Sequence, residues 1–518
     1  MSDKSEFPVL NAKRIRPLNR QSPKQIFRHF YIFKPLLLGL LIAQVLSTMS
    51  VYRSNAELVQ MVDAVTRAGY LSVPNQNIAQ ELGTFSAAFF GGLFFTLTIG
   101  ACLSLSAFAI AWIWDRLLKR RDILLLPVLA IWVGCIGSVN SEGLCRIATA
   151  YFLLIPIVVF ATTLYWLPEQ RDEKMGLKIV VHLIILIILA AVASSQLNSN
   201  FFVRIRDNLL LSNPVGRKIS NLYYDYTLHA ARVFKSQDQR LIRTCSLAFT
   251  DDATLQQQLE TALLDNDYLV LDRGEPTDLD IIRVGDQLDF KIRIWTIIQT
   301  TPKEFLEYPR EILRGFSEQS DKYVFFRWFT FLSLFMVSGI VLYLSVYAVF
   351  RIICGFFMDS TPASVAAGML CLVAGLALLV PLYFGSEKYA DAGTLAQGLS
   401  SENWRERVIA LRYVAERRTD ISSLPGHTRM LESPHIPERY WLAKALRFSR
   451  SREAYRELLM LMHDPSFNVA YSAIQALGQR GDRRAVAEIL PLLEVSDNWY
   501  VQWYAYRAIR KLGWCQGK

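Results

Sequence analysis

Charged residues are scarce in this sequence. They make up 20% of its 518 residues, hydrophobic residues make up 52%, and the mean hydropathy is positive. This composition excludes an ordinary soluble protein and indicates one that crosses a membrane several times. The formal net charge of +10 would suggest nucleic acid in a soluble chain. Here the basic excess lies mainly beside hydrophobic segments and in the C-terminal region, where membrane topology accounts for much of it, so we expect no nucleic-acid partner.

Cysteine is also rare, and its spacing carries no motif. The seven cysteines form no CxxC pair and no cluster with histidine, so neither a metal site nor a disulfide framework is predicted. Four of them fall in or beside apolar segments, where the thiol behaves as a small hydrophobic group. The three outside such segments, whose redox state the sequence leaves open, are Cys145, Cys245 and Cys515.

Signatures of catalysis are missing as well. The chain has no Walker-type phosphate loop and no GxGxxG, HExxH, GxSxG or EF-hand pattern. The acid pairs Asp278/Asp280 and Asp286/Asp289 lie among strand and turn signals, where such acids cap turns or face solvent. We therefore expect no cofactor and favour a protein that is not an enzyme. A membrane-bound enzyme that acts on lipid or glycan stays open as an alternative, because an unfamiliar active site leaves no sequence motif.

Seven hydrophobic segments are long enough, or nearly so, to cross a bilayer. No convincing signal-peptide cleavage site follows the basic residues 1–34, so we expect the first segment to be kept as a membrane helix. The predicted spans are residues 35–51, 85–114, 123–137, 147–167, 179–194, 325–350 and 362–384.

Basic segments set the orientation of these spans. Residues 1–34, 115–122 and 169–178 are rich in lysine and arginine, which predicts a cytoplasmic location by the positive-inside rule. Residues 195–322 would then lie outside a bacterial inner membrane, as would the C-terminal region if all seven spans cross. An overlooked half-helix, or a sixth span that re-enters the membrane, would return the C-terminal region to the cytoplasm.

Ionisable side chains are almost absent from the predicted spans. Because such groups mark transport routes, their absence argues against an ion-coupled transporter. His182 is the exception, about a turn inside the fifth span. We expect its ring to bond a neighbouring helix, and an intramembrane polar site that relays protons is the alternative.

Small residues form stripes at every fourth position of two spans. Such faces let helices approach closely, so packing within the bundle is favoured over a subunit interface. The stripes are Gly92, Thr96, Gly100 and Ser104 in the second span and Ala363, Ala367, Cys371 and Gly375 in the last.

The interval 195–322 divides into two parts. Apolar and aromatic residues recur at helical spacing in 217–235, which predicts an amphipathic helix that rests on the bilayer or packs on the neighbouring domain. The rest predicts a small α+β unit. Its expected strands are 240–249, 268–272 and 279–298, the last a hairpin, and its expected helices are 253–265 and 301–317.

The C-terminal region contains a repeat. The segments PERYWLAKALRFS (437–449), NVAYSAIQALGQRG (468–481) and YVQWYAYRAIRKLG (500–513) align with a looser copy, WRERVIALRYVAER (404–417). Aligned in this way, Ala410, Leu442, Ala473 and Ala505 are equivalent, with a period of 31 or 32 residues. A fixed period in this range predicts a helical solenoid, in which each repeat buries its face against its neighbours.

These residues resemble the HEAT family, in particular the short HEAT-like repeats first named from bilin lyases. The likeness lies within residues 401–514 and is carried by DPSFNVAYSAIQALGQRGDRRAVAEILPLLE (464–494) and VQWYAYRAIRKLGW (501–514). It implies a module that holds protein partners and does not imply lyase activity. The chain departs from the pattern at 426–437, which is loop-like where a full helix is expected.

Aromatic residues crowd the end of the predicted solenoid. They are too many to be buried in a two-layer stack, so part of them is a candidate partner-binding surface. The alternative is that they form the terminal cap or pack on the membrane region. Residues 401–518 also contain sixteen arginines and three lysines, which favours pairing with carboxylate, phosphate or lipid head groups. The candidate partner-binding residues are Trp441, Trp499, Tyr500, Trp503, Tyr504 and Trp514.

The sequence therefore predicts an α-helical polytopic membrane protein with a small α+β domain and a C-terminal solenoid of HEAT-like repeats. We expect the solenoid to scaffold an unidentified protein partner. The runner-up is a transporter or lipid-handling protein with a regulatory solenoid. The predicted divisions are a basic segment (1–34), five membrane helices (35–194), an extracytoplasmic segment (195–322), two further membrane helices (323–385), a linker (386–400) and the solenoid (401–518).

Overall fold

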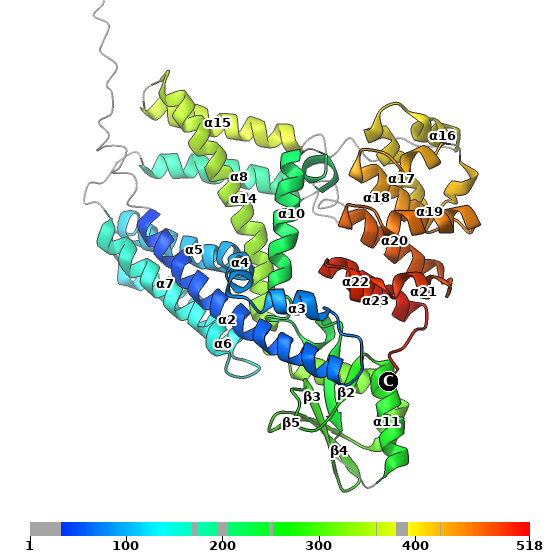
Figure 1. Ribbon diagram of the computed structural model, residues 1–518. Helices are drawn as coiled ribbons and strands as arrows, with labels where there is room; N and C mark the ends of the chain where they lie inside the picture. The colour runs from blue at the N-terminus through cyan, green and yellow to red at the C-terminus, as the bar shows by residue number, and fades with distance from the viewer. Residues whose placement is uncertain are drawn as a thin grey trace, which may run out of the picture.

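The fold has three parts, which Figure 1 shows as long apolar helices, a small α+β unit below them and a stack of short helices beside them. The structure is a computed structural model that describes residues 33–167, 175–194, 206–212, 214–247, 252–358, 360–379, 392–424 and 426–517. Nearly all of the predicted basic segment 1–34 lies outside the described residues.

The long apolar helices coincide with the predicted spans. Four helical segments are long and apolar enough to cross a membrane: Lys34–Arg67, Phe85–Arg116, Arg146–Trp166 and Val324–Gly355. Three shorter apolar helices cover Leu126–Val139, Val180–Val192 and Pro362–Ala377. Seven crossings stay a prediction, because the apolar stretches of these three helices are only 10–17 residues long, and a bilayer requires ~20.

Several elements make up these apolar segments. They are α2 (Phe33–Arg67), α4 (Phe85–Phe95), the π-helical turn η2 (Thr96–Gly100), α5 (Ala101–Arg116), α6 (Leu126–Val139), α7 (Arg146–Trp166), α8 (Met175–Ser194), α14 (Val324–Gly355) and α15 (Ser360–Leu379). The first half of α14 packs with α4, η2, α5, α6 and α7, whereas its second half packs with α8 and α15.

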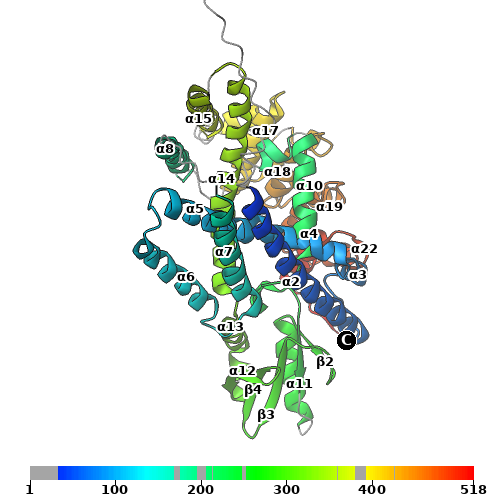
Figure 2. The same cartoon turned by 90° about the vertical axis from the view of Figure 1, so that its left-hand side faces the viewer.

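Helix α2 is longer than the predicted span. It continues for 35 residues to Arg67, whereas the predicted span ended at residue 51. At ~1.5 Å per residue such a helix reaches ~50 Å, well beyond the ~30 Å hydrocarbon core of a bilayer. Its second half stays helical because Leu58, Met61, Val62 and Val65 recur at helical spacing and are buried. Figures 1 and 2 show α2 running from the apolar bundle to the α+β unit.

The small-residue stripes bring helices of this chain together. A Cβ atom added at Gly100 would lie 2.5 Å from Cβ of Ala43 on α2. One added at Gly375 would lie 2.6 Å from a methyl carbon of Leu189 on α8. Both contacts agree with the favoured interpretation, which is packing within the bundle.

The α+β unit contains a five-stranded sheet in the order β2-β1-β3-β4-β5. Strand β1 pairs in parallel with β2 and β3, and β3, β4 and β5 are antiparallel. The predicted hairpin 279–298 is three strands, because the chain turns a second time at Arg293, which has a φ of 57°. The elements are β1 (Arg243–Leu247), α11 (Ala253–Asp265), β2 (Tyr268–Leu271), β3 (Leu279–Val284), β4 (Gln287–Ile292), β5 (Trp295–Thr300), α12 (Pro302–Glu307) and α13 (Pro309–Gln319).

The C-terminal stack is a solenoid. Helices α17 (Trp404–Arg417), α18 (Ile436–Leu446), α20 (Phe467–Arg480) and α23 (Trp499–Lys511) pack on one another in chain order. The equivalent residues Ala410, Leu442, Ala473 and Ala505 are all fully buried, in agreement with the predicted period. The loop-like stretch 426–437 contains the short 3-10 helix η8 (Thr428–Met430) and the start of α18. The remaining elements are α16 (Ala392–Ser400), η7 (Ile421–Ser423), α19 (Arg452–Met462), α21 (Ala485–Ile489) and α22 (Leu492–Val495).

One continuous cluster of buried side chains joins the solenoid to the other two parts. It contains Leu58 and Val62 of α2, Leu269 of β2 and first-helix residues of every repeat. Gln516 adds two hydrogen bonds, since its Oε1 accepts from the Leu71 amide at 2.8 Å and its Nε2 donates to the Leu71 carbonyl at 2.7 Å. The repeats are therefore fixed against α2 and the sheet.

Candidate functional site

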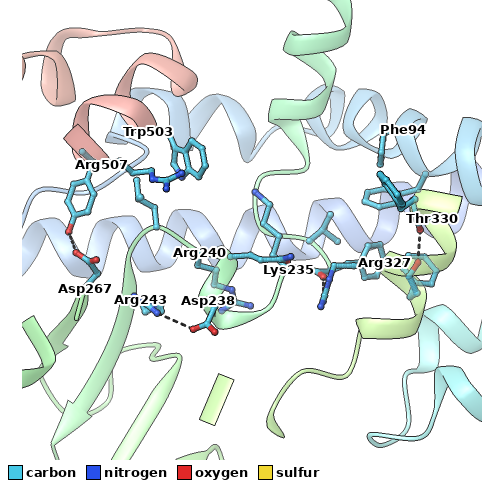
Figure 3. Close-up of a pocket in the computed structure, with 18 of the residues that line it drawn as sticks. Phe94, Lys235, Asp238, Arg240, Arg243, Asp267, Arg327, Thr330, Trp503 and Arg507 are labelled. Carbon is cyan, nitrogen blue, oxygen red and sulfur yellow. Dashed lines mark hydrogen bonds and ion pairs between the residues drawn. The ribbon is translucent and has the colours of Figure 1, made fainter. Parts of the chain in front are cut away.

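A cavity of about 810 Å³ lies where the apolar helices, the α+β unit and the last repeat meet. Figure 3 shows Trp503 and Arg507 of α23 at one end of this cavity and Phe94 and Thr330 of α4 and α14 at the other. The wall between the two ends is the connection from α10 (Pro214–His229) to β1. Because three parts contribute, the cavity depends on their packing.

The wall begins with a sharp turn after α10. Phe234 has a positive φ of 59°, which is unusual for a residue with a Cβ atom. Its ring packs on Phe95 of α4 and Phe326 of α14, with centroids 5.0 and 4.5 Å apart. These contacts hold the turn against the bundle and place the next residue, Lys235, at the cavity.

An ion-pair network supports the same wall. The carboxylate of Asp278 accepts from Arg232 Nη2 at 2.7 Å and from Arg240 Nη1 at 2.5 Å, and it also accepts from the Thr244 amide. Burial acts to raise the pKa of Asp278, but the two guanidinium groups and the amide lower that pKa below its ordinary value. The expectation that Asp278 caps a turn or faces solvent is therefore wrong, because the two arginines enclose it.

The other three acids of the predicted pairs lie away from the cavity wall. Asp280 accepts hydrogen bonds from Ser246 and Thr277, and Asp286 is exposed at the β3–β4 turn. Asp289 departs from the expectation, since it is buried and accepts from Gln299 Nε2 at 2.9 Å. In the part of the chain that the structure describes, no three histidine, cysteine or acidic side chains lie together as metal ligands.

Basic side chains dominate the cavity. Its six basic residues are Lys235, Arg240, Arg243, Arg327, Arg507 and Arg510, and its two acidic residues are Asp238 and Asp267. Four of the arginines have a carboxylate partner, in the pairs Arg240–Asp278, Arg243–Asp238, Arg327–Asp321 and Arg510–Asp267. Within the described ranges no carboxylate lies at ion-pair distance from Lys235 or Arg507. The cavity therefore carries uncompensated positive charge.

Lys235 lies in an unfavourable electrostatic environment. Burial lowers the pKa of its ammonium group from 10.5 to about 8, and the positive charges of Arg232 and Arg240 contribute to the shift. Most Lys235 side chains are still protonated at neutral pH, so three cations lie close together. An anion bound at this position would be attracted by all three.

The opposite end of the cavity is apolar. It is formed by Phe94 and Phe95 of α4 and by Phe326, Phe331 and Leu334 of α14. Phe331 is 60% exposed, although it belongs to a helix long enough to cross a membrane. The cavity thus joins a cationic wall to an aromatic one.

Trp441, one of the predicted partner-binding residues, is buried inside the protein. Its Nε1 donates to Oδ2 of Asp207 in the π-helical turn η4 (Arg206–Leu210) at 2.6 Å. Asp207 also pairs with Arg206 at 2.7 Å, and the Arg206 guanidinium lies 3.9 Å from the centroid of the Tyr440 ring. A segment of this chain therefore covers α18 at Trp441.

The other predicted aromatic residues also contact this chain. Trp499, Tyr500, Tyr504 and Trp514 are partly buried and pack against the shared core. The ring of Tyr500 meets that of Tyr224 on α10 at 5.1 Å. Of the six predicted residues, Trp503 lines the cavity of about 810 Å³. Trp499 and Trp503 both line a second, smaller pocket. These positions fit the alternative of packing on the rest of the chain, and a partner surface formed by these residues stays a prediction.

His182 lies apart from the cavity, among α8, α14 and α15. Its Nδ1 is 2.7 Å from the Tyr343 hydroxyl, and its ring packs edge-on against Tyr347 with centroids 4.5 Å apart. The histidine is thus hydrogen-bonded to a neighbouring helix, as favoured from the sequence.

The basic residues of the cavity were not predicted as a site. They come from separate segments, and no local spacing links them. The richness of the solenoid in arginine was the one signal, since it includes Arg507 and Arg510. Nothing comparable marks Lys235 or Arg327.

Comparison with known proteins identifies only the repeats. A family model described as HEAT repeats matches residues 455–514. No curated protein matches the chain. No solved structure matches it either. The family match shows HEAT-like repeats in the C-terminal region. Helices α17 and α18 precede the matched residues and belong to the same stack.

Proposed function

We propose that the protein is an integral membrane protein, of the bacterial inner-membrane type, whose HEAT-like solenoid is an interaction and scaffolding module and not an enzyme. HEAT repeats generally mediate protein–protein contacts, which supports the interaction role. The observation that carries the proposal is the core shared by α2, the sheet and the repeats. A solenoid fixed in this way would hold its partner at a set position beside the membrane.

The shared core also supports a single side for both extramembrane parts. Side chains of α2, β2 and the repeats are buried against one another, and no bilayer fits between such surfaces. With a cytoplasmic N-terminus and seven crossings, this joint unit lies outside. The predicted domain boundaries are kept in this proposal, with α2 extending beyond the membrane to Arg67.

Site-specific photocrosslinking tests the scaffolding role. A photoreactive amino acid at exposed Arg456 on α19 should give a discrete adduct with a partner protein, whereas the same group at exposed Asp286 in the sheet serves as the matched control. Deleting the solenoid is unsuitable, because deletion would expose the shared core. Equal adduct patterns at the two positions, or no adduct at Arg456, would contradict scaffolding.

Lipid handling with a regulatory solenoid is the second candidate function. The cavity favours it, because uncompensated cations there adjoin two helices of the apolar bundle. If the protein handles lipid, filling the cavity with bulky side chains should abolish lipid handling, whereas the contacts of the solenoid with proteins should persist.

A further inference from the structure

We propose that the cavity binds an anionic lipid, with its phosphate group between Lys235 and Arg507 and its hydrocarbon chains along Phe94, Phe331 and Leu334. The proposal rests on the membrane insertion proposed above and deepens the second candidate function by naming the ligand class. It is carried by the combination, in one cavity, of cations without counterions and an apolar end on membrane-type helices.

The cationic end has donors that the described chain does not satisfy. Lys235 and Arg507 come from different parts of the fold and have no described carboxylate partner. The Nε groups of Arg240 and Arg243 are buried and have no described acceptor. A buried donor without an acceptor is costly, and a phosphate group offers several oxygen acceptors at once. The cluster therefore suits an oxyanion that several elements can share.

The size and shape of the cavity favour a lipid over free phosphate. Its volume of about 810 Å³ is typical of sites for small organic molecules and far exceeds that of a phosphate ion. A free ion would leave the five apolar side chains at the other end without a ligand. Hydrocarbon chains would remove that apolar surface from water.

Access to the apolar end is open on the side of the bundle. Phe331 is largely exposed on α14, about two turns into a segment that is long and apolar enough to span a membrane. At the other end, the Arg507 guanidinium lies 5.0 Å from the centroid of the Trp503 ring. Tryptophan and arginine together are typical of the level of lipid head groups. A lipid could thus enter sideways from the outer leaflet.

Photocrosslinking in a defined bilayer tests this assignment. The full-length protein is reconstituted in phosphatidylcholine nanodiscs that contain phosphatidylglycerol with a photoreactive group in one acyl chain. We expect crosslinks to map to Phe94, Phe331 or Leu334, and unlabelled phosphatidylglycerol to compete. The double variant Lys235→Gln/Arg507→Gln should lose about tenfold in apparent affinity, which corresponds to ~1.4 kcal/mol. Lys235→Arg/Arg507→Lys keeps both charges and should retain most binding.

Matched controls separate this site from general attraction to the membrane. Lys303→Gln and Arg273→Gln remove exposed cations of the same types outside the cavity and should leave crosslinking unchanged. Equal yields with a phosphatidylcholine probe, or equal losses in the control variants, would overturn the proposal. So would binding of inorganic phosphate that depends on Lys235 and Arg507 while lipid crosslinking does not. Insertion is measured separately by alkaline extraction from membranes, so an inserted protein without these crosslinks contradicts only the lipid site.

Discussion

The repeats and the cavity use the same kinds of side chain in opposite ways. Between successive repeats, two arginines are matched by carboxylates, in the pairs Arg407–Glu438 and Arg439–Asp464. In the cavity, Lys235 and Arg507 have no described carboxylate partner. Matched charges fix one repeat on the next, whereas unmatched charges leave a positive potential for a ligand. The contrast separates residues that build the fold from residues that are free to bind.

The largest expected effect is on a matched pair. Glu438 is completely buried, and Arg407 Nε donates to it at 2.5 Å. Glu438→Ala would leave a largely buried guanidinium without its counterion, so we expect a loss of ~3–5 kcal/mol in the free energy of unfolding. Chemical denaturation of the purified protein, followed by circular dichroism, measures it. A loss of less than ~1 kcal/mol would show that the pair does not hold the repeats together.

Trp441 sharpens the comparison, because the sequence assigned it to a partner and the structure buries it. Trp441→Phe removes the bond from Nε1 to Asp207 while keeping an aromatic ring. Loss of a hydrogen bond to a charged acceptor should lower stability by ~1.5–3 kcal/mol in the same denaturation experiment. Unchanged stability together with loss of a crosslinked partner would instead place Trp441 in a binding surface.

Binding of phosphatidylglycerol should weaken between pH 7 and pH 9. The pKa of Lys235 is lowered to about 8, so its charge is present below that pH and lost above it. Lys235 is the single lysine among the residues that line the cavity. The other charged groups around it are Arg232, Arg240, Arg243, Arg327, Arg507, Arg510, Asp238 and Asp267. The phosphodiester of this lipid stays singly charged. We expect about threefold weaker binding at the higher pH, which is less than the tenfold loss expected when both cations are removed.

Lys235→Arg supplies the control for the pH experiment. Its guanidinium stays protonated, so the affinity of this variant should be constant over the same interval. A wild-type protein without pH dependence, or a variant that keeps it, would exclude Lys235 as the titrating group.

The smallest expected effect concerns an exposed pair. Arg314 and Glu318 lie 2.8 Å apart on α13, with side chains 75% and 62% exposed. Because water screens such pairs, Arg314→Gln should change the free energy of unfolding by no more than ~0.5 kcal/mol. A larger decrease in the free energy of unfolding would show that an exposed ion pair stabilises this fold without being buried.

The sequence predicted the regular parts of the fold well. Periodic alanine and leucine positions located the repeats, and hydrophobic runs located the apolar helices, because both patterns are local. The extension of α2 to Arg67 was missed, since the apolar positions after residue 51 are spaced for a helix face and do not form a continuous run. The second turn at Arg293 was missed because only its positive φ marks it.

The cavity could not be predicted from the sequence in the same way. Its cations come from the α10–β1 connection, α14 and α23, which approach one another only through the shared core. Lys235 looks like an ordinary basic residue until the Phe234 turn places it beside Arg232 and Arg240. Whether a cation lies beside a carboxylate depends on how distant segments pack together. The spacing of residues in the sequence does not show this.

Labelling from outside intact cells tests whether the repeats and the α+β unit share the outer side of the membrane. Cys515 is exposed at the end of the solenoid, and Asp286→Cys in a Cys515→Ser background places a thiol on the sheet. A membrane-impermeant maleimide should label both full-length proteins in intact cells, and the Cys515→Ser protein without the new thiol should stay unlabelled. Labelling of only one position, or of neither until the membrane is permeabilised, would contradict a shared outer location.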